Sequence, residues 1–201
     1  MASELNINNK IAALSLTYYQ KFILNYSKYK IDRFICAASS LYIAIKVNEI
    51  LNIGLDNFIV VYFKKMSHFR VFNKEMSDEI KLDLKQKFCF IENEILQNIG
   101  FDFDIILPYD YLEEINHEFE NEIRIYSNSF CNDFYYLNVC LYFHPLEIAL
   151  ACIYLSHIFL NKEFNLKWLE KFSIKNENVF NLIKRYQNFI EFKINSIKNV
   201  E

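Results

Sequence analysis

The sequence contains very little glycine and proline. Among 201 residues there are two of each, Gly54, Gly100, Pro108 and Pro145. Tight turns with φ > 0 need glycine, and a β-sandwich or β-barrel needs many such turns, so an all-β fold is excluded. Phosphate-binding loops place several glycines in one turn, and no such cluster is present. This scarcity rules out P-loop and dinucleotide-binding domains and favours a mostly helical chain.

Long apolar runs, an excess of basic charge and paired cysteines are also missing. The longest apolar run is eight residues, 148–155, whereas a bilayer span needs about 20. The polar composition of 1–13 predicts no signal peptide. With 22 basic and 25 acidic residues, the chain lacks the basic excess typical of nucleic-acid-binding proteins. Five cysteines without C-x-x-C spacing indicate free thiols in a reducing compartment, cytosol or nucleus.

No group of residues points to catalysis or to metal binding. The histidines share no ligand spacing, and we interpret His157, within an apolar stretch, as a core or edge residue. Two carboxylate pairs occur, as expected by chance in a chain with 25 acidic residues, and we expect them to be solvated. Hydrolase and zinc-protease signatures are missing too. We therefore expect no catalytic residue, no metal and no cofactor. The histidines and carboxylate pairs are His68, His117, His144, His157, Asp102/Asp104 and Glu113/Glu114.

Apolar residues at helical spacing are abundant. Two stretches, 32–50 and 145–160, are apolar nearly all round and rich in small residues, which favours helices at the centre of a bundle. Asp32 is the expected N-cap, Pro145 the first helical residue and Gly100 a C′ residue. We predict helices over 11–26, 32–50, 56–65, 77–99, 108–119, 121–136, 145–160, 165–172 and 176–196, a loop at 67–76 and extended chain at 101–107. In the last helix, Phe180, Ile183, Phe189 and Phe192 are predicted to face inward.

One short pattern occurs twice. Residues 39–44 and 151–156 both follow the order small, small, aliphatic, Tyr, aliphatic, small, with an offset of 112. This match indicates two related helical repeats. The alternative to two repeats is that six positions match by chance, because the chain is so rich in apolar residues.

Two charged residues lie in apolar surroundings. Lys46 ends the stretch 32–50 after a run of apolar residues, and Glu92 lies among Phe88, Phe90 and Ile91. The simpler interpretation is that both are surface charges above apolar stems. The more specific one pairs them at the rim of an apolar patch, where they orient a docked partner.

Five motifs resemble those of the cyclin family. Residues 33–49 (RFICAASSLYIAIKVNE) resemble the third helix of a cyclin box, which ends in A-x-K-V-E-E, and 91–109 (IENEILQNIGFDFDIILPY) resemble the fifth helix and its exit. Residues 130–133 resemble the F-x-N-D of transcription-type cyclins, 145–155 their P-x-x-I-A-x-A-x-x-Y-L and 168–172 their W-x-x-F. The motifs occur in family order, and the second half is most similar to cyclins K, L and T.

The resemblance implies an all-α fold of two tandem cyclin boxes with about five helices each. The first box is 1–104 and lacks most of its first helix, and the second is 105–201. It also implies a regulatory subunit, not an enzyme, that binds and activates a cyclin-dependent kinase through the αC helix of the kinase. Lys46 and Glu92 map to the residues that reach kinase backbone groups and each other. The apolar positions of the groove map to Ile43, Val47, Leu96, Phe101 and Phe103.

The implied complex is a heterodimer with the kinase catalytic subunit, acting in transcription or RNA processing. We expect it in the nucleus, and also in the cytoplasm, without direct nucleic-acid or membrane binding. Two alternatives stay open: a cyclin-fold adaptor that does not activate a kinase, and a scaffold that resembles the core of B-type initiation factors. The acidic balance and the lack of zinc-ribbon cysteines argue against the scaffold. The sequence departs from the family at Ala44, Ile45 and Asn48, but it keeps the lysine and one glutamate.

Overall fold

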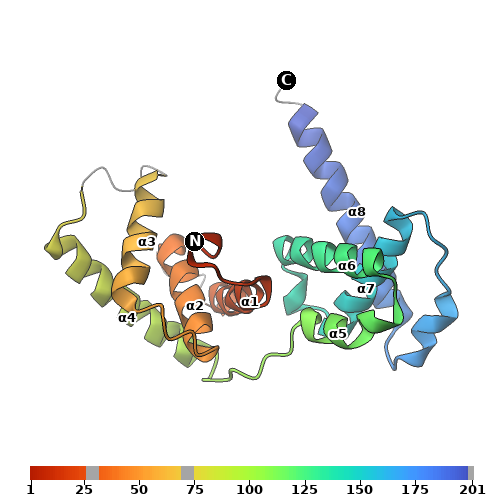
Figure 1. The fold of residues 1–201 in the computed structure, drawn as a ribbon, viewed down its shortest axis with the longest axis horizontal. Coiled ribbons are helices and arrows are strands. Elements are labelled where there is room, and N and C mark those ends of the chain that lie inside the picture. Colours follow the sequence, from red (N-terminus) through yellow and green to blue (C-terminus); the bar gives the residue numbers. More distant parts are fainter. Residues whose placement is uncertain (26–31, 69–74, 199–201) are drawn as a thin grey trace. The chain divides into compact units, whose positions relative to one another are not determined.

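The computed structural model describes residues 1–25, 32–68 and 75–198, and every regular element within these ranges is a helix. This confirms the predicted all-α fold class. The chain divides into two compact units, Met1–Ile105 (unit 1) and Ile106–Glu201 (unit 2) (Figure 1). Unit 1 contains η1 (Ser3–Leu5), α1 (Asn9–Asn25), α2 (Arg33–Val47), α3 (Leu55–His68) and α4 (Asp78–Asn98). Unit 2 contains α5 (Pro108–Ile115), η2 (Asn116–Glu118), α6 (Asn121–Phe134), η3 (Tyr135–Leu137), η4 (Val139–Leu141), α7 (Pro145–Phe159), η5 (Leu166–Lys171) and α8 (Asn176–Lys198).

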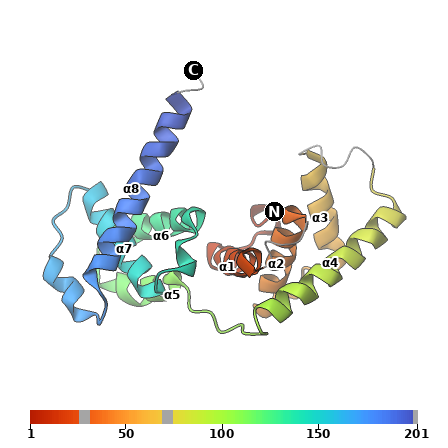
Figure 2. The same cartoon turned by 180° about the vertical axis from the view of Figure 1, so that it is seen from behind.

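Helix α2 is the centre of unit 1. It packs against α1, α3 and α4, and its small residues Cys36, Ser40 and Ala44 are fully buried. Small side chains allow neighbouring helix axes to approach closely. The Ser40 hydroxyl is satisfied within the helix, because Oγ donates to the Cys36 carbonyl at 2.9 Å. The position of α2 among its neighbours can be followed in Figures 1 and 2.

Helix α7 has the same role in unit 2. It packs against α5, α6 and α8, with Ala149, Ala151 and Cys152 fully buried. Ser156 Oγ donates to the Cys152 carbonyl at 2.8 Å, as Ser40 does in α2. The two matching sequence patterns therefore lie in the helices around which the two units are built.

Aromatic rings fill the space between α3 and α4. Phe88 packs edge-on against Phe58 and Tyr62, with ring centroids 5.7 and 5.1 Å apart. All three rings are buried. Edge-to-face pairs add to the stabilisation that burial of the rings provides. This cluster fixes α4, which carries Glu92, against the rest of unit 1.

The helix starts follow the predicted signals more closely than the ends. Asp32 Oδ1 accepts from the Phe34 amide at 2.8 Å, which confirms Asp32 as the N-cap of α2. The end of α2 was predicted at residue 50 and lies at Val47. Helix α3 runs to His68, so the predicted loop at 67–76 is wrong for its first two residues, and 69–74 lie outside the described residues. The helix predicted at 108–119 is an α-helix followed by a 3₁₀ turn. The helix predicted at 165–172 is entirely 3₁₀.

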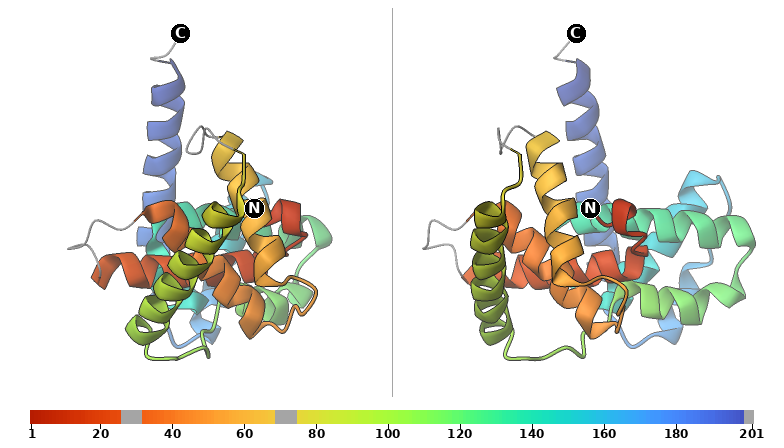
Figure 3. Two further views of the ribbon diagram at one scale, coloured as in Figure 1. Left: turned by 90° about the vertical axis from the view of Figure 1, so that its left-hand side faces the viewer. Right: turned by 60° about the vertical axis from the view of Figure 1, so that its left-hand side comes forward.

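Helix α8 is longer than its packing surface. Figure 3 shows its C-terminal part extending beyond the other helices of unit 2. Ile183 is buried as predicted, but Phe180 is exposed and Phe192 is 71% exposed, so those two inward positions are wrong. Phe180 lies near the start of α8, and one edge of its ring still packs against Tyr154 of α7, with ring centroids 5.9 Å apart. Toward the C-terminal end, the regular spacing of apolar residues continues after the neighbouring helices have ended, and spacing alone does not show where that happens.

The five thiols differ in accessibility. Cys36, Cys131 and Cys152 are buried, Cys140 is half-buried and Cys89 is exposed on α4. All five are free. Within the described residues, no helix is both long and apolar enough to span a membrane.

Candidate functional site

The end of α2 and the last part of α4 bring Lys46 and Glu92 together. Lys46 Nζ donates to Glu92 Oε1 across the two helices. The lysine side chain is 45% exposed and that of the glutamate 18%, so the pair lies at the surface of unit 1. An exposed ion pair contributes about 0–1 kcal/mol to stability. A contribution to the stability of unit 1 therefore does not explain why a lysine and a glutamate are paired at this position.

The pair retains hydrogen-bonding capacity toward a partner. An ammonium group has three donors, and Lys46 spends one of them on Glu92. Glu92 Oε2 accepts no hydrogen bond from any other residue that the structure describes. Free donors next to a free acceptor suit a carbonyl and an amide of another main chain.

The five apolar positions predicted around the pair do not share one environment. Val47 and Leu96 are half-buried beside it, and Phe103 and Phe101 are exposed, the latter to 57%. Ile43 is only 1% exposed, so its expected place on the surface is wrong. Helix α2 carries apolar residues on nearly every side, so its sequence does not show which of them face outward. Ile43 is one of those that face the core.

Tyr42 is a residue of this surface that sequence reasoning missed. Lys46 Nζ lies 5.1 Å from the centroid of its ring, and the ring packs on Phe58 at 4.9 Å. Burial raises the pKa of the Tyr42 hydroxyl, and the Glu92 carboxylate adds to the rise. The spacing of four residues between Tyr42 and Lys46, which is one helical turn, is the signal by which it could have been found.

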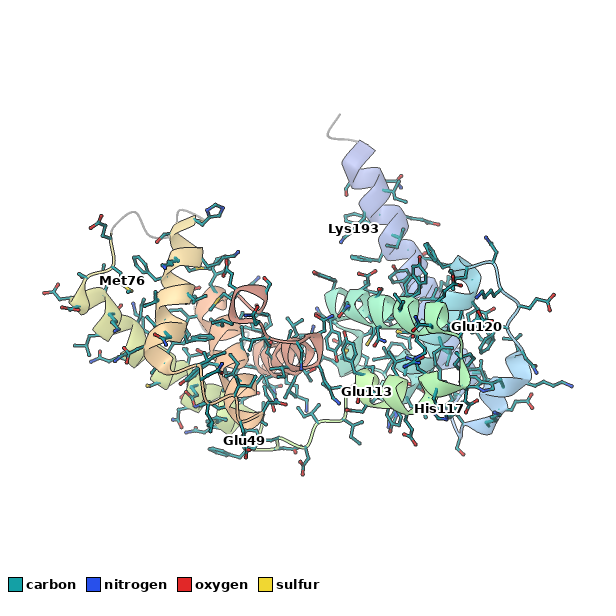
Figure 4. The ribbon with its side chains drawn as sticks, in the orientation of Figure 1. Glu49, Met76, Glu113, His117, Glu120 and Lys193 are labelled. Carbon is teal, nitrogen blue, oxygen red and sulfur yellow. The ribbon has the colours of Figure 1, made fainter. Side chains whose placement is uncertain are left out.

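A left-handed residue three positions after Lys46 ends α2. Glu49 has φ 54°, its amide donates to the Lys46 carbonyl at 3.0 Å, and the Ile50 amide donates to the Ile45 carbonyl at 3.1 Å. This is a Schellman motif, which usually has glycine at this position. The motif explains why α2 stops at Val47. Figure 4 labels Glu49 at this end of the helix.

Helix α4 ends with the same motif and with two left-handed residues. Gly100 has φ 67° and Phe101 has φ 56°. The Gly100 amide donates to the Gln97 carbonyl at 3.1 Å and the Phe101 amide to the Leu96 carbonyl at 3.0 Å, which confirms Gly100 as C′. A left-handed conformation costs a residue other than glycine roughly 1–2 kcal/mol. Phe101 does not recover this cost by burial, and strained residues of this kind cluster at functional sites.

Short local turns hold the chain after Phe101. The Asp104 amide donates to Asp102 Oδ1 at 3.2 Å, and the Ile105 amide donates to the Phe103 carbonyl at 2.9 Å. Both aspartates are exposed. Phe101 and Phe103 are thus presented by a defined backbone next to the end of α4.

Substitutions at the two helix ends are expected to change stability in opposite directions. No atom lies within 4 Å of a Cβ added to Gly100, so Gly100→Ala costs only backbone strain, about 1 kcal/mol of unfolding free energy. Glu49→Gly removes the same kind of strain and is expected to stabilise by up to about 1 kcal/mol. Urea unfolding measures both. Gly54→Ala is the control: Gly54 has no positive φ, so alanine there should be neutral or slightly stabilising, and destabilisation equal to that of Gly100→Ala would contradict this explanation.

Among the residues that the structure describes, the histidines form no metal site. Within the described residues, no three His, Cys, Asp or Glu side chains are grouped so that they hold a metal ion. His157 is 8% exposed, and its Nδ1 lies 2.9 Å from the Ile153 carbonyl oxygen. It is a largely buried residue at the end of α7.

The family follows from a comparison of the sequence with models of known families. The model of the cyclin N-terminal domain matches residues 1–104. The chain belongs to the cyclin family. Its relatives include transcription-type members, as the motifs in the sequence suggested. The matched region contains the Lys46–Glu92 pair and the ends of α2 and α4.

Several cyclins match most of the chain at low identity. Cyclin-C1-2 of Arabidopsis thaliana is 24% identical over 195 residues, which cover 95% of this chain and 72% of the relative. Cyclin-C of Drosophila melanogaster is 20% identical over 200 residues, covering 95% and 71%. Cyclin-T1-3 of Oryza sativa subsp. japonica is 26% identical over 168 residues, covering 80% and 34%. Cyclin T was among the subgroups that the motifs suggested, and cyclin C was not.

A solved structure has the same fold. A chain in the crystal structure of the yeast RNA Pol II CTD kinase CTDK-1 complex superposes with a TM-score of 0.78 at 18% identity. The match covers 94% of this cyclin and 63% of that chain. The present chain thus spans less than two thirds of the length of its structural neighbour.

Proposed function

We propose that this cyclin is the regulatory subunit of a cyclin-dependent kinase, which it binds and activates in transcription or RNA processing. The αC helix of the kinase lies against the ends of α2 and α4. Lys46 donates to a kinase carbonyl, Glu92 accepts from a kinase amide, and Phe101 and Phe103 supply apolar contacts. Holding αC in place completes the Lys–Glu pair that a kinase needs for phosphoryl transfer. The chain itself is not an enzyme, and the complex is a nuclear heterodimer.

The exposed pair with its unused donors and acceptor is the observation that carries this proposal. It contributes little to stability, and the strained, exposed Phe101 lies on the same unit. A helix in an apolar groove with charged residues at its rim is a common mode of peptide recognition. Transcription as the process is supported by the cyclin C and cyclin T relatives and by the kinase complex that contains the structural neighbour.

Reconstitution with kinase catalytic subunits tests the proposal. The tagged cyclin is co-expressed with each of a panel of transcription-type cyclin-dependent kinases, and the purified complexes are assayed on a polymerase-tail peptide. We expect one kinase to co-purify at 1:1 stoichiometry and to phosphorylate the peptide only when the cyclin is present.

The other outcomes separate the alternatives. A stable complex without activity would contradict activation and leave an adaptor. Failure of every kinase to bind, together with a salt-sensitive shift of a promoter duplex by the cyclin alone, would overturn the kinase partner in favour of a scaffold on DNA.

A further inference from the structure

From Arg185 onward, α8 has an exposed face that the proposed kinase contact does not use, and its C-terminal part extends beyond the other helices of unit 2 (Figure 3). Arg185, Phe189, Phe192 and Lys193 follow one another at spacings of four, three and one residues. With about 3.6 residues per turn, these positions lie on one side of the helix. Glu191, the one acidic residue of 178–198, falls on the other side. Figure 4 labels Lys193 on this part of α8.

Aromatic rings hold both cations of this face. Lys193 Nζ lies 4.7 Å from the ring centroid of Phe189 and 5.2 Å from that of Tyr136, which belongs to η3. The guanidinium carbon of Arg185 lies 5.1 Å from the ring centroid of Phe143, which precedes α7. A ring attracts a cation through its π face and, unlike a carboxylate, does not occupy its N–H donors. The two cations are therefore held at the surface with their hydrogen-bonding capacity left for a partner.

Neither cation has a carboxylate partner among the described residues. Asp133 of α6 also reaches α8, but its Oδ2 accepts from the Tyr186 hydroxyl at 2.8 Å. Acidic residues outnumber basic ones in this chain, 25 to 22, and none of those described is turned toward Arg185 or Lys193. This face is thus a positive region of an acidic chain, and it complements a negatively charged partner. Lysines elsewhere in the chain do form ion pairs, namely Lys46, Lys65, Lys81, Lys85, Lys87, Lys162 and Lys171.

Two exposed rings distinguish this face from a site for a simple anion. The side chain of Phe192 is 71% exposed and that of Tyr136 is 73% exposed. Aromatic residues and arginine are enriched where proteins bind one another. A free anion would use the charges and leave the rings in water, whereas an acidic protein segment with apolar side chains covers both. The α8 surface, as we call it, consists of Tyr136, Phe143, Arg185, Phe189, Phe192 and Lys193.

The spacing of the two cations suits a partner helix. Arg185 and Lys193 are eight residues apart, which corresponds to about 12 Å along α8. A second helix lying alongside α8 matches this distance with two carboxylates seven or eight residues apart. Apolar side chains between those carboxylates, on the same side of the partner helix, then meet Phe189 and Phe192. Ridges and grooves of two helices interlock when they pack side by side in this way.

We infer that the α8 surface binds an acidic amphipathic helix of a partner protein. Its carboxylates pair with Arg185 and Lys193, and its apolar side chains cover the rings. This binding does not depend on the kinase contact, because every residue of the α8 surface belongs to unit 2 and the Lys46–Glu92 pair belongs to unit 1. The two surfaces are therefore tested separately.

A short synthetic helix tests the inference on the full chain. The probe is Ala-Gln-Ala-Glu-Ala-Gln-Leu-Leu-Ala-Gln-Glu-Ala-Gln-Ala, labelled with fluorescein and stapled on the side opposite its glutamates, so that it is helical before it binds. One control peptide has glutamine in place of both glutamates, and another has alanine in place of both leucines. Fluorescence anisotropy measures binding. We expect saturable binding of the probe and at least about tenfold weaker binding of the glutamine and alanine peptides.

Matched charge variants locate the contact. Arg185→Gln with Lys193→Gln should weaken binding of the probe at least about tenfold, because two charge-assisted contacts are lost. The control, Lys175→Gln with Lys184→Gln, removes the same charge from exposed positions outside the α8 surface and should leave the affinity unchanged. Arg185→Lys with Lys193→Arg keeps both charges and should retain the affinity within about threefold.

Several results would overturn the inference. These are no saturable binding of the probe, equal binding of the glutamine or alanine peptide, or equal weakening by the two charge-removing double variants. Tighter binding of a single-stranded polyuridylate than of the probe, abolished by Arg185→Gln with Lys193→Gln, would assign the surface to nucleic acid instead. Both substituted residues are exposed, so folding should be preserved, and thermal unfolding followed by circular dichroism verifies this.

Discussion

Exchanging the charges of the Lys46–Glu92 pair, by Lys46→Glu together with Glu92→Lys, is expected to weaken kinase binding at least about 30-fold. The exchanged residues can still pair with each other across α2 and α4, so unit 1 keeps its ion pair. Toward a partner the chemistry is reversed, because a carboxylate now meets a carbonyl and an ammonium meets an amide. Loss of a charged partner at an interface costs about 2–5 kcal/mol.

A second ion pair on α4 provides the control. Lys87 Nζ lies 2.7 Å from Asp83 Oδ2, and both side chains are about half exposed. The double variant Asp83→Lys with Lys87→Asp exchanges charges on the same helix and also leaves the net charge unchanged. Affinity for the kinase is measured by surface plasmon resonance. Similar affinities of the two exchanged proteins would show that the Lys46–Glu92 pair does not contact the kinase.

Truncating Phe88 is expected to destabilise unit 1 by about 3–5 kcal/mol. Its ring is 1% exposed and contacts Phe58 and Tyr62, so Phe88→Ala leaves a cavity where α4 meets α3. Phe90 lies two residues further along the same helix and is 60% exposed. The same substitution there, Phe90→Ala, should change the unfolding free energy by no more than about 0.5 kcal/mol.

The single tryptophan allows the two units to be followed separately during unfolding. Trp168 belongs to unit 2, whereas far-ultraviolet circular dichroism follows the helices of both units. Phe88→Ala should lower the urea midpoint seen by circular dichroism and leave the tryptophan transition in place. An unchanged dichroism midpoint would contradict the role of Phe88 in the core of unit 1. An equal shift of both signals would show that the units unfold together.

The sequence carried enough information to predict most helices and their starts. Asp32 and Pro145 mark helix starts, through side-chain capping and the fixed φ of proline, and the structure confirms both. The helices predicted from 77 and from 108 begin with Ser77 as an N-cap and with Pro108 in the first turn. Helix ends were predicted less well when glycine was missing. Gly100 marked the end of α4, but Glu49 ends α2 in the left-handed conformation, and no rule of composition favours glutamate there. The backbone hydrogen bonds from the Glu49 and Ile50 amides to the end of α2 hold this residue in a conformation that its own preference opposes.

The sequence predicted the charged residues of the candidate site, but only some of its apolar residues. Lys46 and Glu92 stood out because charge is unusual among apolar neighbours, and the structure joins them. Ile43 and Tyr42 are adjacent in a helix with apolar residues on every side, so periodicity does not show which of them faces outward. The α8 surface was not predicted, because some of its rings are distant from its cations in the sequence and become their neighbours only when unit 2 folds.

The unequal exposure of the thiols makes this cyclin convenient for site-specific labelling. Cys89 is exposed on α4, one helical turn before Glu92, whereas burial raises the pKa of Cys36 to about 11 and keeps the Cys152 thiol protonated. Maleimides react with accessible thiolates, so a dye added in slight excess should attach at Cys89 of the natural sequence. Such a fluorophore would report on the surroundings of the Lys46–Glu92 pair without any engineered cysteine.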